Sequence, residues 1–354
     1  MVYVGPWIFC ELTSPERARN KMEKCLMKMM SMFLFGILAT CAAAQSATIK
    51  IATVAPEGTA WMRELRAGAD AVKKRTAERV EIKFYPGGVM GDEPSVMRKI
   101  KIGQLQGGAF TGGELSQIVK DAQIYSLPFL FKSIDEVDKV RAQLDPLLKK
   151  SFEPAGFEAV AISGGGFAYT MSVRDVRTKD DLKSAKVWVP QGDRIAEVGF
   201  SAAGVTPISL PLADVYTSLQ TGLIDTVGNT PAGAIAFQWH TKLKHMIDVP
   251  LTYVVGILVI DKKVFDALPA DDQKAVSEEL SAAFARLEKI NREDDAQARV
   301  ALEKQGVSIY KPNAEETKAW DALGTASRAD LMAKHEITPE MAAALDKALS
   351  QARK

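Results

Sequence analysis

The chain has 354 residues, of which 47% are hydrophobic and 25% charged, so it can bury a large core and is neither disordered nor fibrous. Its 45 Lys and Arg balance 44 Asp and Glu, which excludes the strong positive field of a nucleic-acid-binding protein. Three His and three Cys leave little material for a metal- or thiol-dependent enzyme, and we expect no cofactor.

Residues 1–46 have the features of an export signal with an upstream extension. An apolar run over 29–44 follows Lys24 and Lys28 and ends in small residues, a pattern typical of a secretory signal peptide. The run is shorter than the ~20 apolar residues of a membrane-spanning helix. We therefore expect a periplasmic protein, and Cys41 leaves lipid anchoring as an alternative.

Strand and helix patterns alternate from residue 47 onward. The expected strands are 48–54, 80–85, 105–110, 157–162, 186–189 and 251–260. The expected helices are 60–77, 93–102, 133–148, 212–220, 270–304 and further helices from about 314. This alternation predicts an α/β fold with a mostly parallel sheet covered by helices. The unusual length of the helix over 270–304 predicts a brace across two lobes, and two shorter helices are the alternative.

One stretch of the chain has a specific order of residues. Its parts are Asp181-Leu182-Lys183, Pro190, Ala203-Gly204, Pro207, Val215-Tyr216, Leu219-Gln220, Gly222 and Asp225. Together with Met90–Glu93 and Leu127–Phe131, this order resembles the solute-binding subunits of tripartite ATP-independent periplasmic (TRAP) transporters. The resemblance covers essentially all of residues 47–354.

The resemblance implies a two-lobed periplasmic-binding-protein fold, also called a Venus flytrap. Residues 47–165 are expected to form mainly lobe 1. Residues 166–250 are expected to form mainly lobe 2, with crossover segments that return to lobe 1. A crossover strand, the long bracing helix and C-terminal helices are expected in residues 251–354.

The resemblance also implies a function without catalysis. A small organic solute, a carboxylate or related compound, is held between the lobes and delivered to the small and large membrane subunits of a TRAP permease. The alternatives are a secreted α/β hydrolase or lyase and a lipid-anchored solute sensor. The sequence has no G-x-S-x-G and no H-E-x-x-H motif, so we expect no enzyme. A homodimer through the long helix is a further alternative.

The sequence departs from the family at two positions. Family members hold a substrate carboxylate on an arginine two residues before the proline and commonly on a second one in a Gly-Phe-Arg segment, where this chain has Trp188 and Ala168. We therefore expect Trp188, Phe167 and Tyr169 to form an apolar or stacking wall for a flat or aliphatic solute with few charges. In the alternative, Trp188 packs in the core and another arginine binds an anion. The candidates are Arg174, Arg177 and Arg194.

Other candidate ligand contacts each have a structural alternative. Asn229 offers an amide in a loop where the family has an asparagine, but it is also a turn residue. Glu93 matches a family carboxylate, but a helix start favours acidic residues in any case. Gly164–Gly166 could offer backbone N–H groups to an anion or form a crossover. The remaining candidates, for which capping or core packing is the alternative, are Thr59, Trp61, Asp193, Tyr216 and Trp239.

Overall fold

The computed structural model describes residues 46–354, so the predicted export segment and the alternative at Cys41 lie outside the described residues. The strands are β1 (Ala47–Thr53), β2 (Val80–Tyr85), β3 (Gly107–Thr111), β4 (Phe157–Ser172), β5 (Trp188–Pro190), β6 (Ile208–Leu210), β7 (Thr226–Asn229), β8 (His245–Asp261) and β9 (Ser308–Tyr310).

The α-helices are α2 (Ala60–Arg75), α3 (Glu93–Lys101), α4 (Ile134–Ser151), α5 (Lys179–Leu182), α6 (Arg194–Ala202), α7 (Val215–Thr221), α8 (Pro231–Ala236), α9 (Lys262–Asp266), α10 (Ala270–Lys304), α11 (Ala314–Ala333) and α12 (Pro339–Ala352). The 3₁₀ helices are η1 (Glu114–Gln117), η2 (Lys120–Ser126), η3 (Glu153–Ala155), η4 (Leu212–Asp214) and η5 (Trp239–Thr241). No helix within residues 46–354 combines the length and apolar composition needed to cross a membrane.

A seven-stranded sheet connects the two lobes. Its order is β2-β1-β3-β8-β4-β7, with β9 paired to β8, and a separate two-stranded sheet joins β5 and β6. We call the part around β1–β3 lobe 1 and the part around β5–β7 lobe 2. The pairs β1–β2, β1–β3 and β8–β9 are parallel, whereas β8 is antiparallel to both β3 and β4. The sheet is therefore mixed, not mostly parallel as predicted, because two long crossover strands run in opposite directions through its centre.

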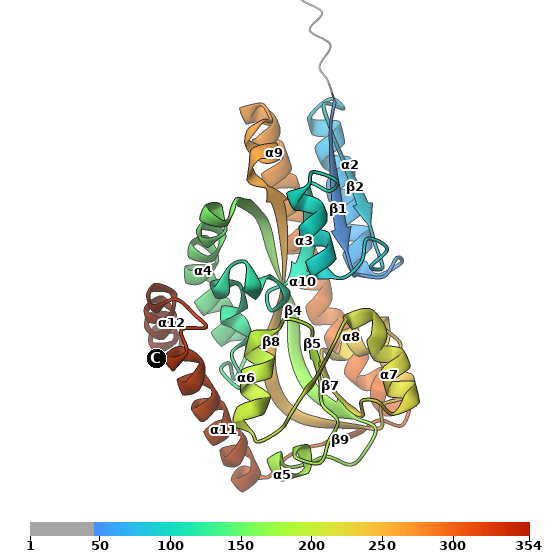
Figure 1. Cartoon of the computed structure of the whole chain (residues 1–354), viewed down its shortest axis with the longest axis vertical. Coiled ribbons are helices and arrows are strands. Elements are labelled where there is room, and N and C mark those ends of the chain that lie inside the picture. Colours follow the sequence, from blue (N-terminus) through green and yellow to red (C-terminus); the bar gives the residue numbers. More distant parts are fainter. Residues whose placement is uncertain (1–45) are drawn as a thin grey trace, which may run out of the picture. The chain divides into compact units, whose positions relative to one another are not determined.

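Strands β4 and β8 are much longer than their predicted ranges. They contain 16 and 17 residues and pair with each other along almost their whole length (Figure 1). Gly164–Gly166 lies inside β4 with a register shift at that point, and it does not form a loop. Cross-strand pairing with β8 keeps this glycine run within the strand, and Gly166 adopts φ 104° at the register shift.

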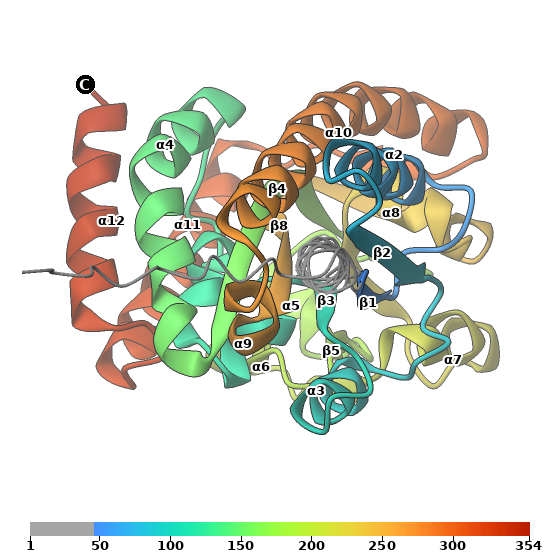
Figure 2. The ribbon, with the colours of Figure 1, turned by 90° about the horizontal axis from the view of Figure 1, so that it is seen from above.

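The two faces of the sheet are covered by different helices. Along β8, Leu258 and Ile260 pack into the cluster with α2 and α10, whereas Ile257 and Val259 pack into the cluster with α3 and α4. Successive side chains of a strand point to opposite faces, so β8 contributes to both cores. Figure 2 shows α10 lying along α2.

The 35-residue helix α10 braces the lobes as predicted. It packs against α2 of lobe 1, against β4, and against α8 of lobe 2. Midway along it, Glu288 accepts a hydrogen bond from Gly164 N at 3.1 Å, and Asn291 Nδ2 donates one to Gly164 O at 2.8 Å. The helix thus holds β4 at the point where that strand passes from one lobe toward the other. The predicted limits of the lobes at 165 and 250 stay a prediction.

Candidate functional site

A cleft with a volume of about 980 Å³ receives lining residues from both lobes. The carboxyl ends of β1 and β3 and the starts of α2 and α3 contribute from lobe 1, and the ends of β5 and β7 with the starts of α6 and α8 contribute from lobe 2. The middle parts of β4 and β8, one stretch of α10 and residues of α11 also contribute to the lining. Ligands of α/β proteins commonly bind at the carboxyl ends of strands, so this position is typical of a binding site.

Trp188 lines the cleft and is also part of the lobe 2 core. It is 4% exposed, its Nε1 donates a hydrogen bond to Leu210 O at 3.0 Å, and its ring meets Trp239 edge to face at 5.3 Å. Trp239 in turn stacks on Phe237, which lies in the lining while Trp239 does not. Trp188 thus lines the cleft, as expected of a wall residue, and also packs in the core, as the alternative has it.

The structure does not bring Phe167 and Tyr169 to the cleft beside Trp188. Ala168 and Thr170 line the cleft, so the alternating side chains of β4 turn Phe167 and Tyr169 to the other face. There Phe167 packs edge to face on Tyr253 at 5.3 Å. The Arg299 guanidinium carbon lies 4.9 Å from the centre of the Tyr169 ring. The predicted wall of three aromatic side chains is therefore not assembled.

The other predicted residues divide between cleft and core. Thr59 lines the cleft and caps α2, with its Oγ1 accepting from Met62 N at 3.4 Å. Trp61 lines the cleft and packs edge to face on Phe284 at 6.0 Å. Tyr216 lies outside the lining, and the Lys242 Nζ is 5.4 Å from the centre of its ring.

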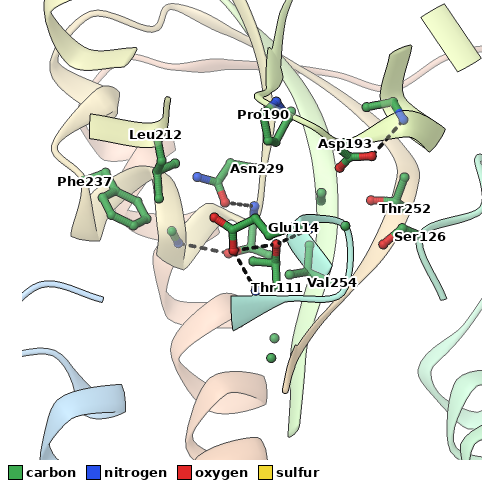
Figure 3. A pocket seen from close by; sticks show the side chains of 18 of the residues that line it. Thr111, Glu114, Ser126, Pro190, Asp193, Leu212, Asn229, Phe237, Thr252 and Val254 are labelled. Carbon is green, nitrogen blue, oxygen red and sulfur yellow. Dashed lines mark hydrogen bonds between the residues drawn. The ribbon is translucent and has the colours of Figure 1, made fainter. Parts of the chain in front are cut away.

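Asn229 lies at the end of β7 in the cleft lining. Its Oδ1 accepts a hydrogen bond from Thr230 N at 2.8 Å, so one end of the amide is already used in the turn (Figure 3). The amide nitrogen makes no hydrogen bond to the residues that the structure describes. Asn229 can therefore donate to a solute while its oxygen holds the start of α8.

Gly256→Ala is expected to disturb lobe 1 at the wall of this cleft. A Cβ on Gly256 would overlap the Trp61 ring, far inside van der Waals contact, whereas a Cβ on Gly165 would meet Val254 Cγ1 at an ordinary 3.4 Å. We expect Gly256→Ala to lower the free energy of unfolding by about 1–3 kcal/mol. Gly165→Ala, the matched control in the partner strand, is expected to cost less than about 1 kcal/mol. Urea unfolding checks both, and equal losses would contradict this account.

None of the three arginines that the sequence offered as alternative anion ligands lines the cleft. Arg174 pairs with Asp225 at 3.3 Å, Arg177 with Asp175 at 2.7 Å, and Arg194 with Glu336 at 3.0 Å. These carboxylates belong to the chain itself. Among the described residues, the one cation in the lining is Arg63, an exposed residue of α2 whose Nη1 donates to Gly58 O at 2.8 Å.

Within the described part of the chain, five acidic residues line the cleft, and the pKa values of three of them, Glu93, Glu114 and Asp193, are raised. Glu93 is in the first turn of α3, Glu114 opens η1 directly after β3, and Asp193 caps α6 by accepting from Ala196 N at 2.9 Å. Figure 3 shows Glu114 and Asp193 within the lining. The sequence predicted Glu93 and Asp193 as ligand contacts but did not point to Glu114.

The surroundings of these carboxyl groups favour their neutral forms. Burial, and then the charges of Glu114 and Asp92, raise the pKa of Glu93 to about 8. Burial raises the pKa of Asp193 to about 6 and also raises that of Glu114, against the hydrogen bonds that Glu114 accepts from Thr111. Strongly shifted carboxyl groups in a cleft are typical of functional sites.

The position of Glu114 after β3 was the signal that sequence reasoning could have used. The residues Gly112-Gly113-Glu114 follow directly on a buried strand, as Thr59 follows β1. Both strands end at the same edge of the sheet, where polar residues converge. Arg63 carries no comparable signal, because its place at the cleft depends on how α2 packs.

Comparison with known proteins agrees with this geometry. The family model for the bacterial extracellular solute-binding proteins of family 7 matches residues 51–335. The C4-dicarboxylate-binding periplasmic protein DctP of Rhodobacter capsulatus is 23% identical over 259 residues, which are 72% of this chain and 78% of the relative.

Solved structures have the same fold. A TRAP periplasmic solute-binding protein from Ochrobactrum anthropi, with its C-terminus bound in the ligand-binding pocket, is 27% identical with a TM-score of 0.76 over 88% of this chain and 97% of that one. One from Desulfovibrio salexigens with bound orotic acid is 20% identical with a TM-score of 0.80 over 86% and 99%. The resemblance seen in the sequence is confirmed, and the chain belongs to the bacterial extracellular solute-binding proteins of family 7.

Proposed function

We propose that this protein captures a small organic solute in the periplasm and delivers it to the small and large membrane subunits of a TRAP permease. The observation that carries the proposal is the cleft of about 980 Å³, which both lobes line and which β4, β8 and α10 cross. A solute that touches both lobes favours a closed arrangement by the contacts made only there. Residues 1–46 are proposed to direct export.

Family membership also bears on the alternatives. The family consists of solute-binding proteins, and neither the family match nor the described residues support a secreted hydrolase or lyase, or a homodimer. Binding and release without conversion of the solute is therefore the activity that we propose. The membrane subunits are then the partners that distinguish loaded from empty protein.

A screen of organic solutes by thermal unfolding tests the proposal. A true ligand is expected to raise the unfolding midpoint in proportion to the logarithm of its concentration, to be recovered unchanged, and to reduce the radius of gyration in small-angle X-ray scattering. Thr252→Trp, which fills the cleft from β8, is expected to abolish these effects. Val173→Trp, at an exposed position directly after β4 and outside the cleft lining, is the control and should leave them intact.

Transport is tested with the membrane subunits in proteoliposomes. Uptake of the identified ligand is expected only when the loaded protein is added outside. A screen in which no solute stabilises the protein, or in which a stabilising solute is chemically converted, would contradict the proposed function.

A further inference from the structure

The charged residues that line the cleft are predominantly acidic. They are Asp92, Glu93, Glu114, Asp193, Asp294 and the single basic residue Arg63. Five acidic groups against one basic group give this lining a formal charge of −4 when all are ionised. A solute that offers only carboxylate groups would add further negative charge to a partly buried site, where charges interact strongly.

Glu93 is the least compensated of these groups. Its side chain lines the cleft, it is 5% exposed, and within residues 46–354 it has neither a hydrogen-bond donor nor an ion-pair partner. The neighbouring Asp92 differs, because it accepts a hydrogen bond from Ser95 N at 3.1 Å. A buried carboxyl group without a partner is costly, so its presence indicates a partner that arrives with the solute.

Glu114 and Asp193 place two more carboxyl groups nearby, one from each lobe. Glu114 accepts hydrogen bonds from Thr111 N at 2.8 Å and Thr111 Oγ1 at 3.0 Å, both through Oε2, while its Oε1 makes no hydrogen bond to the described residues. The Asp193 carboxylate lies against Gly113, so closely that a Cβ there would overlap it. Carboxyl groups from both lobes therefore meet at one end of the cleft.

We propose that the solute carries an ammonium or amidinium group, which binds among Glu93 and Glu114 of lobe 1 and Asp193 of lobe 2. This inference rests on the proposed function and names the chemical class of its solute. A cation supplies the hydrogen-bond donors and the charge that these carboxyl groups lack. The aromatic residues Trp61 and Trp188 then contact the apolar body of the solute.

The position of the cation also connects the two lobes. Glu93 and Glu114 contact it from lobe 1 and Asp193 from lobe 2, so the cation adds an attraction between the lobes where Asp193 already lies against Gly113. A carboxylate elsewhere in the same solute is compatible with this site, because Arg63 and the Asn229 amide remain as donors. The cation is the group that decides affinity.

Sets of three matched compounds test the proposal in titration calorimetry. The sets are phenethylamine, phenylalanine and 3-phenylpropanoate; isopentylamine, leucine and 4-methylpentanoate; and pyrrolidine, proline and cyclopentanecarboxylate. In each set the body is kept while the ammonium or the carboxylate is removed. We expect that compounds with the ammonium bind at least about tenfold more tightly than the anion of their set at pH 8.

Variants connect this preference to the named residues. Glu93→Gln is expected to weaken ammonium binding about ten- to hundredfold at pH 8, because a charge-assisted hydrogen bond is lost. Asp193→Asn keeps an N-cap side chain and is expected to weaken it about tenfold. Asp70→Asn removes an exposed carboxylate of α2 outside the cleft and should leave affinity unchanged.

The pH dependence of affinity distinguishes ionised carboxylates that bind a cation from protonated carboxyl groups that bind an anion. The charged groups that act on Glu93 are Glu114 and Asp92, and Asp193 and Arg63 line the same cleft. The raised pKa values of Glu93 and Asp193 mean that a cation displaces protons from them. Affinity for ammonium compounds should therefore rise from pH 6 to pH 8. A carboxylate held by protonated acids would bind more weakly over the same interval.

The outcomes distinguish the two proposals. Tighter binding of the anions, affinity that falls from pH 6 to pH 8, or no binding by any ammonium compound overturns the cation site. If carboxylates from the broader screen bind, the proposed function stands without it, whereas a screen with no ligand at all overturns both. Should Glu93→Gln fail to fold, Asp193→Asn and the pH profile of the wild-type protein decide between the cation site and its absence.

Discussion

Arg141→Met is expected to lower the free energy of unfolding by about 2–3 kcal/mol, because it removes the buried guanidinium that holds two partly buried carboxylates together. The Arg141 side chain is 8% exposed. Its Nη1 donates to Glu288 Oε1 at 2.7 Å and its Nη2 to Asp145 Oδ2 at 2.9 Å. Glu288 also accepts from Gly164 N, so the same substitution loosens the hold of α10 on β4.

A second arginine provides the matched control. Arg75 of α2 pairs with two carboxylates of α10, those of Glu278 and Glu279, but its side chain is 39% exposed. Water screens these ion pairs, so Arg75→Met is expected to cost much less than Arg141→Met. Urea unfolding of both variants at pH 7 measures the difference. A loss below about 1 kcal/mol for Arg141→Met, or equal losses for the two, would show that burial does not decide the strength of these ion pairs.

Glu93→Gln is expected to remove much of the pH dependence of stability in the absence of solute. The pKa of Glu93 is raised from an ordinary 4.5 to about 8, so the folded chain binds this proton more tightly than the unfolded chain. The stability that this bound proton contributes is therefore complete at low pH and is lost as the pH rises from 4.5 to about 8. Glutamine is neutral throughout. At pH 8 the variant should exceed the wild type by on the order of 3 kcal/mol, and at pH 5 by little.

Urea unfolding of the solute-free protein at pH 5, 6, 7 and 8 checks this expectation. Asp70→Asn, which removes an exposed charge of lobe 1, should run parallel to the wild type. If the free energies of unfolding of Glu93→Gln and the wild type change in parallel with pH, then Glu93 ionises in the empty cleft without a loss of stability. The combination of higher stability without solute and weaker binding with it is the expected sign of a residue that serves the ligand.

The sequence by itself determined the features that depend on neighbouring residues. The long helix was predicted over 270–304 and is observed as Ala270–Lys304, because helical hydrogen bonds and side-chain periodicity are local. Asp193 was recognised as a helix cap from its local sequence, and Glu93 by its match to a family carboxylate at a helix start. The order of residues from Asp181 to Asp225 identified the family.

The tertiary structure decided which side chains reach the cleft. β4 and β8 extend far beyond their apolar runs because each supplies the hydrogen bonds of the other, across about ninety residues of chain. The register shift at Gly164–Gly166 helps to set which side chains of β4 face the solute, and it turns Phe167 away.

The charge of the cleft also depends on the tertiary structure. Arg174 and Arg194 form ion pairs with Asp225 and Glu336, residues that lie far away in the sequence. Glu93 and Glu114 are brought together from two segments without a cation between them. Burial and ion pairing depend on contacts between distant parts of the chain, and the local sequence contains no information about which distant group arrives.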